Sequence, residues 1–372
     1  MSTSGFVPPA YPYDRLAPLA ARAQAHDGGV VDLSIGTPSD PPPPAVLEAL
    51  AGSGAERGYP PSAGSVGLRE AAQGWMRRRL DVEVPTSAIA ACIGTKELVA
   101  GMPHWLRLRD PSRDTVLYPA VSYPSYAMGA TLAGCRAVPV PVDAQWRIDL
   151  SAVASDDAAR ALCLWVNTPG NPAGGLDDLG TVAAWGREHG VPVLSDECYA
   201  EFTWEGPRRS ILAHGSKGLL AVHSVSKRSN LAGLRVGFYA GDAELVGYLS
   251  ELRKHAGLMA PGPAQHAAAV ALGDDDHVEV QARRYRRRLE RAQHILSEAF
   301  DIKAALPGGG LYLWFPAPDG DAWAFTERLA VEGGCLVTPG EFFGPSGAGH
   351  VRLAVVAPDT RLDLVAHRLG VV

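Results

Sequence analysis

The residues best suited to covalent chemistry follow a short apolar run past the middle of the chain. Leu-Leu-Ala-Val at 219–222 is typical of a buried strand, and Ser224 and Lys227 come shortly after it. Arg235 opens the next apolar run. A lysine amine can form a Schiff base with a carbonyl-bearing cofactor, while a hydroxyl and a guanidinium can hold the phosphate of such a cofactor. Because an isolated Ser-x-x-Lys is usually a solvated turn, this interpretation needs support from the rest of the chain.

Other polar residues lie in predicted buried strands or follow them. Asn171 belongs to the proline-rich turn 167–174, which would hold its side chain still, although an Asx turn explains it equally well. Asp196 ends an apolar strand, where a carboxylate needs a partner such as a helix N-terminus or a cationic ring nitrogen. Tyr199 could share that pocket. Arg352 interrupts an apolar strand, so it either meets an anion or faces solvent.

Residues 89–97 form a further candidate site. The pattern predicts a strand, a Gly-Thr turn at Gly94 and the start of a helix. Unpaired N–H groups and the helix dipole make such a helix start favourable for an anion. A plain connection between a strand and a helix explains these residues as well.

The elements that must position these residues alternate regularly from residue 115 onward. The predicted strands are 115–118, 137–140, 161–166, 191–195, 219–223 and 234–239. Helical or polar segments separate most of them, which favours a mainly parallel sheet with helices on both faces. Ligands bind such sheets beyond the carboxyl ends of the strands, where Asn171, Asp196 and Lys227 are expected to gather.

The part of the chain after about residue 263 has an α+β pattern and indicates a smaller domain. Its basic run 283–288 lies in a predicted helix, 278–299, whose apolar residues recur at alternating spacings of four and three. The arginines fall mostly on the other faces, beside acidic residues. A solvated helix surface is therefore favoured over a nucleic-acid patch.

Composition narrows the classes of protein. The chain has 372 residues, 47% of them hydrophobic and 20% charged, which is ordinary for a globular protein of two or three domains. A net charge of −6 argues against nucleic acid as a partner. The five cysteines are scattered, so we expect a reducing compartment, no disulfide framework and no metal site. No signal peptide or membrane span is expected either, and we predict a cytoplasmic location.

Taken together, in this order and spacing, these motifs resemble the fold-type I pyridoxal-phosphate aminotransferases of class I/II over essentially the whole chain. The resemblance implies an α/β fold with a large domain, a mainly parallel seven-stranded sheet between helices, and a smaller α+β domain. It implies an N-terminal segment, 1–43, that packs with the small domain. The large cofactor-binding domain would span 44–262 and the small domain 263–372. A homodimer with shared active sites, pyridoxal 5′-phosphate as cofactor, and an amino acid and a 2-oxo acid as substrates are also implied.

The resemblance also implies roles for individual residues. Lys227 is expected to carry the cofactor and move the proton, and Asp196 to keep the pyridinium nitrogen protonated. Tyr199 and Asn171 would contact the phenolic oxygen of the ring, and Tyr123 would stack on it. The phosphate is expected to be held by Thr95, Lys96 (through its backbone), Ser224, Arg235 and, from the neighbouring subunit, Tyr59. Arg352 would clamp the substrate α-carboxylate beside Gly36.

Several runs resemble the succinyldiaminopimelate aminotransferases of lysine biosynthesis in particular. They are 11–18, 92–98, 123–126 and 226–233, and the last contains Arg-Ser-Asn after the lysine, where the family more often has Thr-Phe. The resemblance implies transfer between N-succinyl-L,L-2,6-diaminopimelate and 2-oxoglutarate. Both substrates end in a distal carboxylate, so the site needs a cationic wall, to which Arg15, Arg228 or Lys254 could contribute.

Alternatives remain open at this point. The chain could be another class I/II aminotransferase, acting on L,L-diaminopimelate, aspartate or aromatic substrates. A lyase or decarboxylase on the same fold would use the same lysine and aspartate. A cofactor-sensing transcription regulator is disfavoured, because only about 30 residues precede a short predicted strand at 30–36, too few for a helix-turn-helix domain.

Overall fold

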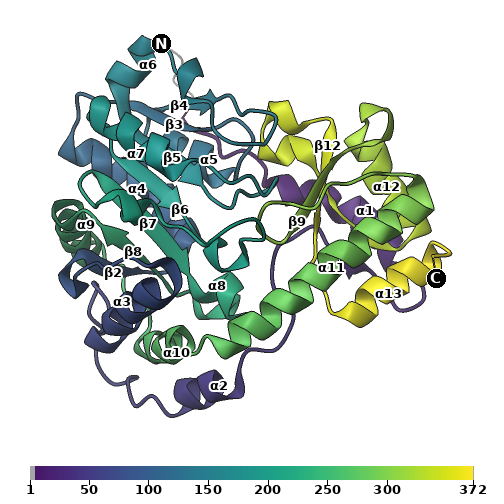
Figure 1. The fold of residues 1–372 in the computed structure, drawn as a ribbon, viewed down its shortest axis with the longest axis horizontal. Helices are drawn as coiled ribbons and strands as arrows, with labels where there is room; N and C mark the ends of the chain where they lie inside the picture. Colours follow the sequence, from purple (N-terminus) through teal and green to yellow (C-terminus); the bar gives the residue numbers. More distant parts are fainter. Residues whose placement is uncertain (1–4, 372) are drawn as a thin grey trace.

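The structure is a computed structural model that describes residues 5–371, in which a larger and a smaller body lie side by side (Figure 1). The larger body is built on a seven-stranded sheet of order β2-β8-β7-β6-β5-β3-β4. Its strands are β2 (Ile89–Cys92), β3 (Thr115–Pro119), β4 (Arg136–Val140), β5 (Ala161–Asn167), β6 (Val193–Asp196), β7 (Leu219–Ser224) and β8 (Gly237–Gly241).

Neighbouring strands from β4 to β7 are parallel, whereas β8 is antiparallel to both β7 and β2. The prediction of a mainly parallel seven-stranded sheet is therefore confirmed. The strand predicted at 234–239 begins later, at Gly237. Residues 232–234 form a 3-10 turn and Arg235 takes a positive φ of 55°, so neither can belong to a strand.

Helices cover both faces of this sheet because its strands are apolar on both sides. Every residue of β5 is buried, which is typical of a central parallel strand. One face packs against α3 (Val66–Leu80), α7 (Leu179–Glu188) and α10 (Gly262–Gly273). The other face packs against α4 (Thr95–Arg109), α5 (Ser125–Leu132) and α9 (Ala243–His255).

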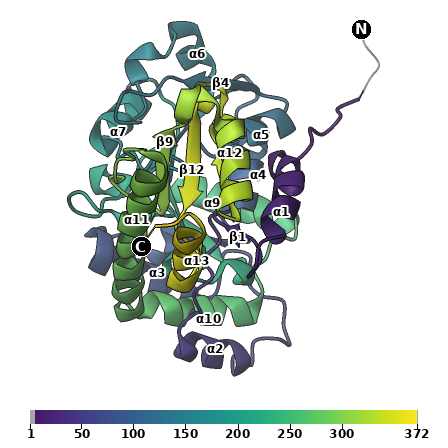
Figure 2. The ribbon, with the colours of Figure 1, turned by 90° about the vertical axis from the view of Figure 1, so that its right-hand side faces the viewer.

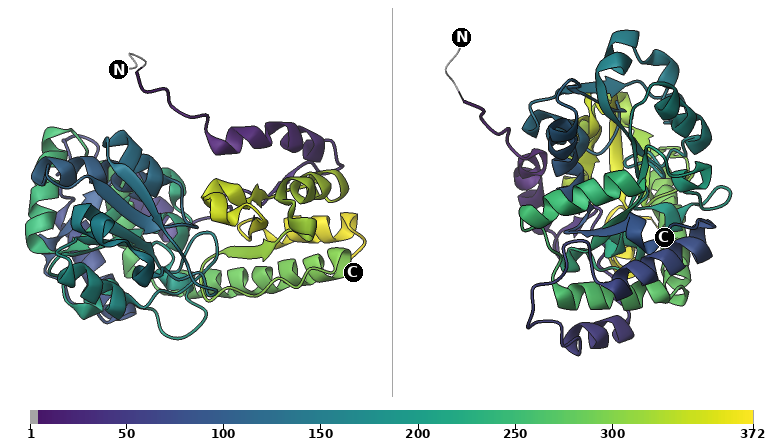
Figure 3. Two further views of the ribbon diagram at one scale, coloured as in Figure 1. Left: turned by 90° about the horizontal axis from the view of Figure 1, so that it is seen from above. Right: turned by 90° about the vertical axis from the view of Figure 1, so that its left-hand side faces the viewer.

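The smaller body holds a three-stranded antiparallel sheet of order β11-β12-β9 (Figure 2). Its strands are β9 (Tyr312–Pro316), β11 (Thr338–Pro339) and β12 (His350–Ala354), and its helices are α11 (Asp276–Phe300), α12 (Ala322–Glu332) and α13 (Asp359–Arg368). The N-terminal segment joins this body (Figure 3). β1 (Val31–Asp32) pairs with β10 (Cys335–Leu336), and α1 (Ala17–Gln24) packs on α12.

One part of the predicted domain division needs correction. α10 begins at the predicted boundary after residue 262, but it packs against α2 (Pro44–Ala51) and α3. Its alanines at 264, 267, 268 and 271 belong to the core of the larger body. We therefore place the boundary between α10 and α11. Periodicity could not reveal this, because a small apolar helix fits either core.

Helix α11 carries the basic run, and it is amphipathic as predicted. Its apolar side, with Tyr285 and Leu289, is buried in the core of the smaller body. Exposed arginines pair with carboxylates, for example Arg286 with Glu290 at 2.8 Å. None of the helices between residues 5 and 371 has the length and apolar character needed to cross a membrane.

Candidate active site

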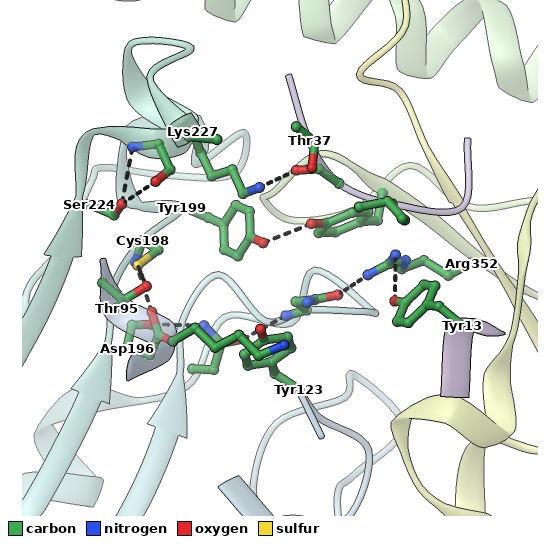
Figure 4. A pocket seen from close by; sticks show the side chains of 18 of the residues that line it. Tyr13, Thr37, Thr95, Tyr123, Asp196, Cys198, Tyr199, Ser224, Lys227 and Arg352 are labelled. Carbon is green, nitrogen blue, oxygen red and sulfur yellow. Dashed lines mark hydrogen bonds between the residues drawn. The ribbon is translucent and has the colours of Figure 1, made fainter. Parts of the chain in front are cut away.

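A cavity of about 330 Å³ lies where the two bodies meet, at the carboxyl ends of the parallel strands (Figure 4). Almost all of the predicted site residues line it. They are Gly36, Thr95, Lys96, Tyr123, Asn171, Asp196, Tyr199, Ser224, Lys227, Arg235 and Arg352. Tyr59 is the exception: it lies in the loop before α3 and is 98% exposed.

Lys227 is held on a single helical turn, α8 (Val225–Arg228), that directly follows β7. The hydroxyl of Ser224 caps this turn by accepting a hydrogen bond from the N–H of Ser226 at 3.1 Å. The Lys227 amine donates to the carbonyl of Gly36. Burial lowers the pKa of Lys227 to about 8, so a substantial fraction of the amine is neutral near physiological pH.

Gly36 lies at a position that admits no side chain. A Cβ added there would be 2.1 Å from the hydroxyl oxygen of Tyr312. Tyr312 in turn shares a hydrogen bond of 2.7 Å with Tyr199. The glycine therefore lets the backbone approach the cavity closely, next to the lysine.

Asp196 ends β6 and is buried, as predicted. Its carboxylate accepts hydrogen bonds from the hydroxyl of Tyr126 at 2.9 Å and from the backbone N–H of Cys198 at 3.2 Å. Burial raises the pKa of Asp196 above its ordinary value. No cation pairs with this carboxylate among residues 5–371. A cationic ring nitrogen would supply a partner charge and favour the ionised form.

Asn171 lies in the loop that follows the neighbouring strand β5, and Tyr123 lies just before helix α5. Asn171 is buried, and its side-chain oxygen accepts a hydrogen bond from Arg352 at 2.8 Å. The ring of Tyr123 lies on the wall of the cavity, edge-to-face with Tyr126 at a centroid distance of 6.1 Å. Both positions suit contacts with a planar ring bound between them.

The turn into α4 and the entry to β8 form one cationic recess. Gly94 has a φ of 72° and precedes Thr95, the first residue of α4. A Cβ on Gly94 would lie 2.0 Å from Nη2 of Arg235. The first N–H groups of α4, the hydroxyl of Ser224 and the guanidinium of Arg235 thus line one side of the cavity. This is the donor set that a phosphate group requires.

We expect Gly94→Ala to weaken cofactor binding roughly 10- to 100-fold, because the methyl group would displace Arg235 and remove charge-assisted hydrogen bonds. The measurement is a titration of the cofactor-free protein with pyridoxal phosphate. Gly134→Ala is the matched control, since Gly134 has a similar φ of 64° but open space around its Cα. Equal affinities for the two variants would contradict the phosphate recess.

Arg352 is 2% exposed, so it does not lie on a solvent face of its strand. Its guanidinium donates to Asn171, to the carbonyl of Ser34 and to the hydroxyl of Tyr13 at 3.2 Å. The rings of Tyr312 and Phe343 lie 4.4 and 4.6 Å from its central carbon. A buried guanidinium held in this way, with no carboxylate partner among the described residues, suits a substrate carboxylate.

The side chain of Lys96 reaches the cavity, although the sequence predicted a role for its backbone alone. Its amine lies 3.4 Å from the hydroxyl of Tyr11 and 4.9 Å from the centre of the Tyr11 ring. Burial alone would lower the pKa of Lys96, but Tyr123 and Tyr11 raise it above its ordinary value. Lys96 therefore adds a cation to the cavity besides Arg352 and the Arg235 of the phosphate recess.

The three residues considered for a distal cationic wall do not line the cavity. Arg228 is 2% exposed and faces Glu201 and Asp275 instead. Arg15 pairs with Glu341, and Lys254 is exposed beside Glu251. A sequence gives no sign of which carboxylate a given cation will meet.

Sequence reasoning also missed several residues of the site. Tyr126 lies in the run 123–126, and its burial beside Asp196 has no clear sign in the sequence. Tyr13 comes from the N-terminal segment and Tyr312 from β9, both far from the other site residues along the chain. Cys198 lines the cavity 3.5 Å from Thr95. Only the fold brings these side chains to the ends of the strands.

The sequence of this chain is similar to a known family. The family model for aminotransferase class I and II matches residues 28–369. The chain belongs to the class I and II aminotransferases. Members of this family depend on pyridoxal 5′-phosphate, and the unpaired Asp196, the recess at Arg235 and the buried Lys227 all fit that cofactor.

Relatives of this aminotransferase act on different substrates. A 4-dedimethylamino-4-oxo-anhydrotetracycline transaminase, OxyQ, of Streptomyces rimosus is 41% identical and covers 97% of this chain and 99% of its own. An LL-diaminopimelate aminotransferase of Desulforudis audaxviator is 34% identical, covering 97% and 95%. The structure of a probable N-succinyldiaminopimelate aminotransferase of Thermus thermophilus has a TM-score of 0.87 at 30% identity, covering 97% and 100%.

Proposed function

We propose that this aminotransferase transfers an amino group between N-succinyl-L,L-2,6-diaminopimelate and 2-oxoglutarate. The observation that carries the proposal is the pair of cations, Arg352 and Lys96, in one cavity. Glutamate has an α-carboxylate and one distal carboxylate. Succinyl-diaminopimelate has an α-carboxylate and two carboxylates farther along its side chain, so each substrate offers an anion to each cation. The structural similarity to a probable N-succinyldiaminopimelate aminotransferase supports the same substrate.

Each of these residues of the cavity would have a separate role in the reaction. Pyridoxal 5′-phosphate, when bound, supplies an electron-withdrawing ring. Lys227 would hold the cofactor and then carry a proton to and from the substrate Cα, for which a pKa of about 8 is well placed. Asp196 would keep the ring nitrogen protonated. Arg352 would fix the α-carboxylate, and Tyr126 would hold Asp196 in position through its 2.9 Å hydrogen bond.

Two tyrosines of the N-terminal segment join the two cations. Tyr13 contacts Arg352 at 3.2 Å, and Tyr11 contacts Lys96 at 3.4 Å. Their ring centroids are 5.6 Å apart. Lys96 belongs to α4 of the larger body and Arg352 to β12 of the smaller body, so a substrate with two carboxylates would bridge the bodies.

Lys96→Met should slow only substrates that carry a distal carboxylate. We expect their half-reaction efficiency to fall roughly 10- to 100-fold, the scale of one charge-assisted hydrogen bond, while alanine and phenylalanine change little. The measurement is the rate at which each amino acid bleaches the cofactor-loaded enzyme. An equal loss for all donors would remove Lys96 from the distal site.

A screen of amino donors tests the substrate itself. The donors are succinyl-diaminopimelate, L,L-diaminopimelate, glutamate, aspartate, alanine and phenylalanine. We expect rapid bleaching with succinyl-diaminopimelate and glutamate, and a slow reaction with aspartate, whose carboxylate would stop short of Lys96. Rapid conversion by alanine or phenylalanine, with none by succinyl-diaminopimelate, would contradict the substrate but not the aminotransferase activity.

The same screen addresses the alternative activities. An aminotransferase converts its cofactor to pyridoxamine phosphate in a single turnover, whereas a lyase regenerates the starting form. A preference for L,L-diaminopimelate over its succinylated form would favour the activity named for the Desulforudis relative.

We also propose a homodimer in which Tyr59 reaches the cofactor of the partner subunit. Its 98% exposure in one chain supports this role, because the side chain is free to reach a partner subunit. Tyr59→Phe should weaken cofactor binding about tenfold through the loss of one hydrogen bond. Titration with cofactor and sedimentation of the same samples test this. A monomer with unchanged affinity would contradict both parts.

A further inference from the structure

The three residues after Lys227 are held by a helix of the other body. Arg228, Ser229 and Asn230 are all partly or fully buried, and each contacts the start of α11 or the end of α10. α11 is the long helix that runs from the larger body along the smaller one (Figures 1 and 3). The sequence of this loop is also the part that departs from the commoner family pattern.

Arg228 uses both terminal nitrogens of its guanidinium in this contact. Its Nη1 donates to the carbonyl of Ala271, and its Nη2 donates to the carbonyl of Asp274 at 3.1 Å and to the carboxylate of Asp275 at 2.9 Å. These acceptors are the end of α10 and the residues that lead into α11. Arg228 therefore fixes the turn that carries Lys227 to the connection between the two bodies.

The opposite side of the guanidinium is fixed to the larger body. Nε of Arg228 donates to Glu201 at 3.0 Å, and the same carboxylate oxygen accepts from the indole N–H of Trp75 at 2.6 Å. The second oxygen of Glu201 accepts from Arg79 at 2.9 Å. A buried carboxylate with this many donors is a rigid anchor. Arg228 thus joins a fixed point of the larger body to the start of α11.

Ser229 and Asn230 extend the contact along α11. The hydroxyl of Ser229 lies 2.9 Å from Nε2 of His277. The side chain of Asn230 donates to Gln281 at 3.3 Å and accepts from the hydroxyl of Tyr285 at 3.3 Å. Asn230 has a positive φ of 56°, so the chain turns sharply there to meet the helix.

Farther along, α11 also contacts the segment 36–40, which meets the Lys227 amine on the side opposite the loop 228–230. Arg288 donates to both carboxylate oxygens of Asp40, at 2.6 and 2.9 Å, and Gln281 donates to Asp40 at 2.7 Å. Asp40 follows Gly36, whose carbonyl accepts from the Lys227 amine. One helix therefore contacts both the loop after Lys227 and the segment opposite it, while its C-terminal half lies in the body that carries Arg352.

We propose that Arg228 is a positioning residue that couples the orientation of Lys227 to the placement of the smaller body. A carboxylate that binds Arg352 shifts the smaller body relative to the larger one. α11 transmits this shift through Asp275 and Arg228 to the helical turn that carries Lys227. The inference rests on the proposed role of Lys227 as the cofactor lysine, which a separate chemical-labelling experiment tests.

The test follows the pH at which the visible absorbance of the cofactor-loaded protein changes, with and without glutarate, a dicarboxylate that has no amino group. In the wild type, glutarate should raise the pH at the midpoint of this change, because a bound anion favours the protonated form of the Lys227 nitrogen. Arg228→Lys keeps a cation opposite Glu201 but loses the donors to Ala271, Asp274 and Asp275. We expect it to move the unliganded midpoint by about 0.5 unit or more, roughly a threefold change in the proton equilibrium, and to reduce the response to saturating glutarate.

A second variant keeps the test decisive if Arg228→Lys does not fold. Asp275→Asn leaves Arg228 and Glu201 in place. It weakens the link to α11, together with the pair that Asp275 forms with Arg78 at 3.0 Å, so it should reduce the response to saturating glutarate as well. Arg286→Gln is the control: it removes a charge from the same helix, at an exposed pair with Glu290. The proposal is overturned if Asp275→Asn has the wild-type midpoint and glutarate response, even if its melting temperature falls.

Discussion

Lys227→Ala will give a folded protein that binds pyridoxal 5′-phosphate but cannot complete amino transfer. The side chain lies on a capped helical turn, and the cofactor contacts proposed for Asp196, Arg235 and Thr95 do not depend on it. Removing the amine removes both the covalent attachment and the proton carrier. We expect the rate of transfer to fall by roughly 10⁴-fold or more, the combined scale of nucleophilic and acid–base catalysis.

Chemical labelling identifies the lysine independently of activity. Borohydride reduction of the yellow wild-type protein should fix the cofactor to a single peptide, the one that contains Lys227. Lys96→Ala is the matched control, because Lys96 is the other lysine in the cavity wall. That variant should stay yellow and label at Lys227. Label on Lys96, or on any lysine other than Lys227, would refute the assignment of the site.

Arg352→Lys is expected to lower kcat/KM for every amino substrate by a similar factor. Lysine keeps the charge but cannot reproduce the planar, two-pronged contact with a carboxylate, and it would leave Asn171 and the carbonyl of Ser34 without their present donor. The loss should be about 2 to 4 kcal/mol, roughly 30- to 1,000-fold, as for other buried charge pairs. Cofactor binding should not change.

Steady-state kinetics with glutamate and with alanine measure this effect. Arg361→Lys is the control, since Arg361 also donates to backbone carbonyls, those of Gly28 and Val30, but lies outside the cavity. A loss confined to glutamate would instead assign Arg352 to the distal carboxylate. Normal kinetics with both substrates would exclude it from the site.

The polar residues at strand ends could be predicted because parallel strands bring their carboxyl ends to one edge. Asn171, Asp196 and Lys227 line one cavity, as this rule predicts. For Thr95 and Arg352 the residues alone left a structural and a functional interpretation open, and the resemblance to the family then implied their roles.

What could not be predicted depends on contacts between distant segments. Tyr13 and Tyr312 enter the site from the N-terminal segment and from β9. Arg228 was a candidate to bind the distal carboxylate of the substrate. Its partners are instead Glu201 and Asp275, which no local sequence pattern connects to it. Lys96 was expected to act through its backbone because helix starts bind anions in that way. The direction of its side chain depends on Tyr11, 85 positions away.

The order of segments along the chain has a consequence for synthesis on the ribosome. Every strand of the seven-stranded sheet lies between Ile89 and Gly241, so that sheet can form while the C-terminal third is still being translated. The N-terminal segment is synthesised first, but its contacts can form only late. β1 pairs with β10 and Asp40 pairs with Arg288, and both partners are translated after the large sheet. A nascent chain would thus acquire its phosphate recess early and its carboxylate clamp only when β12 emerges. A chain that ends before β12 would therefore have the residues of the phosphate recess but lack the carboxylate clamp.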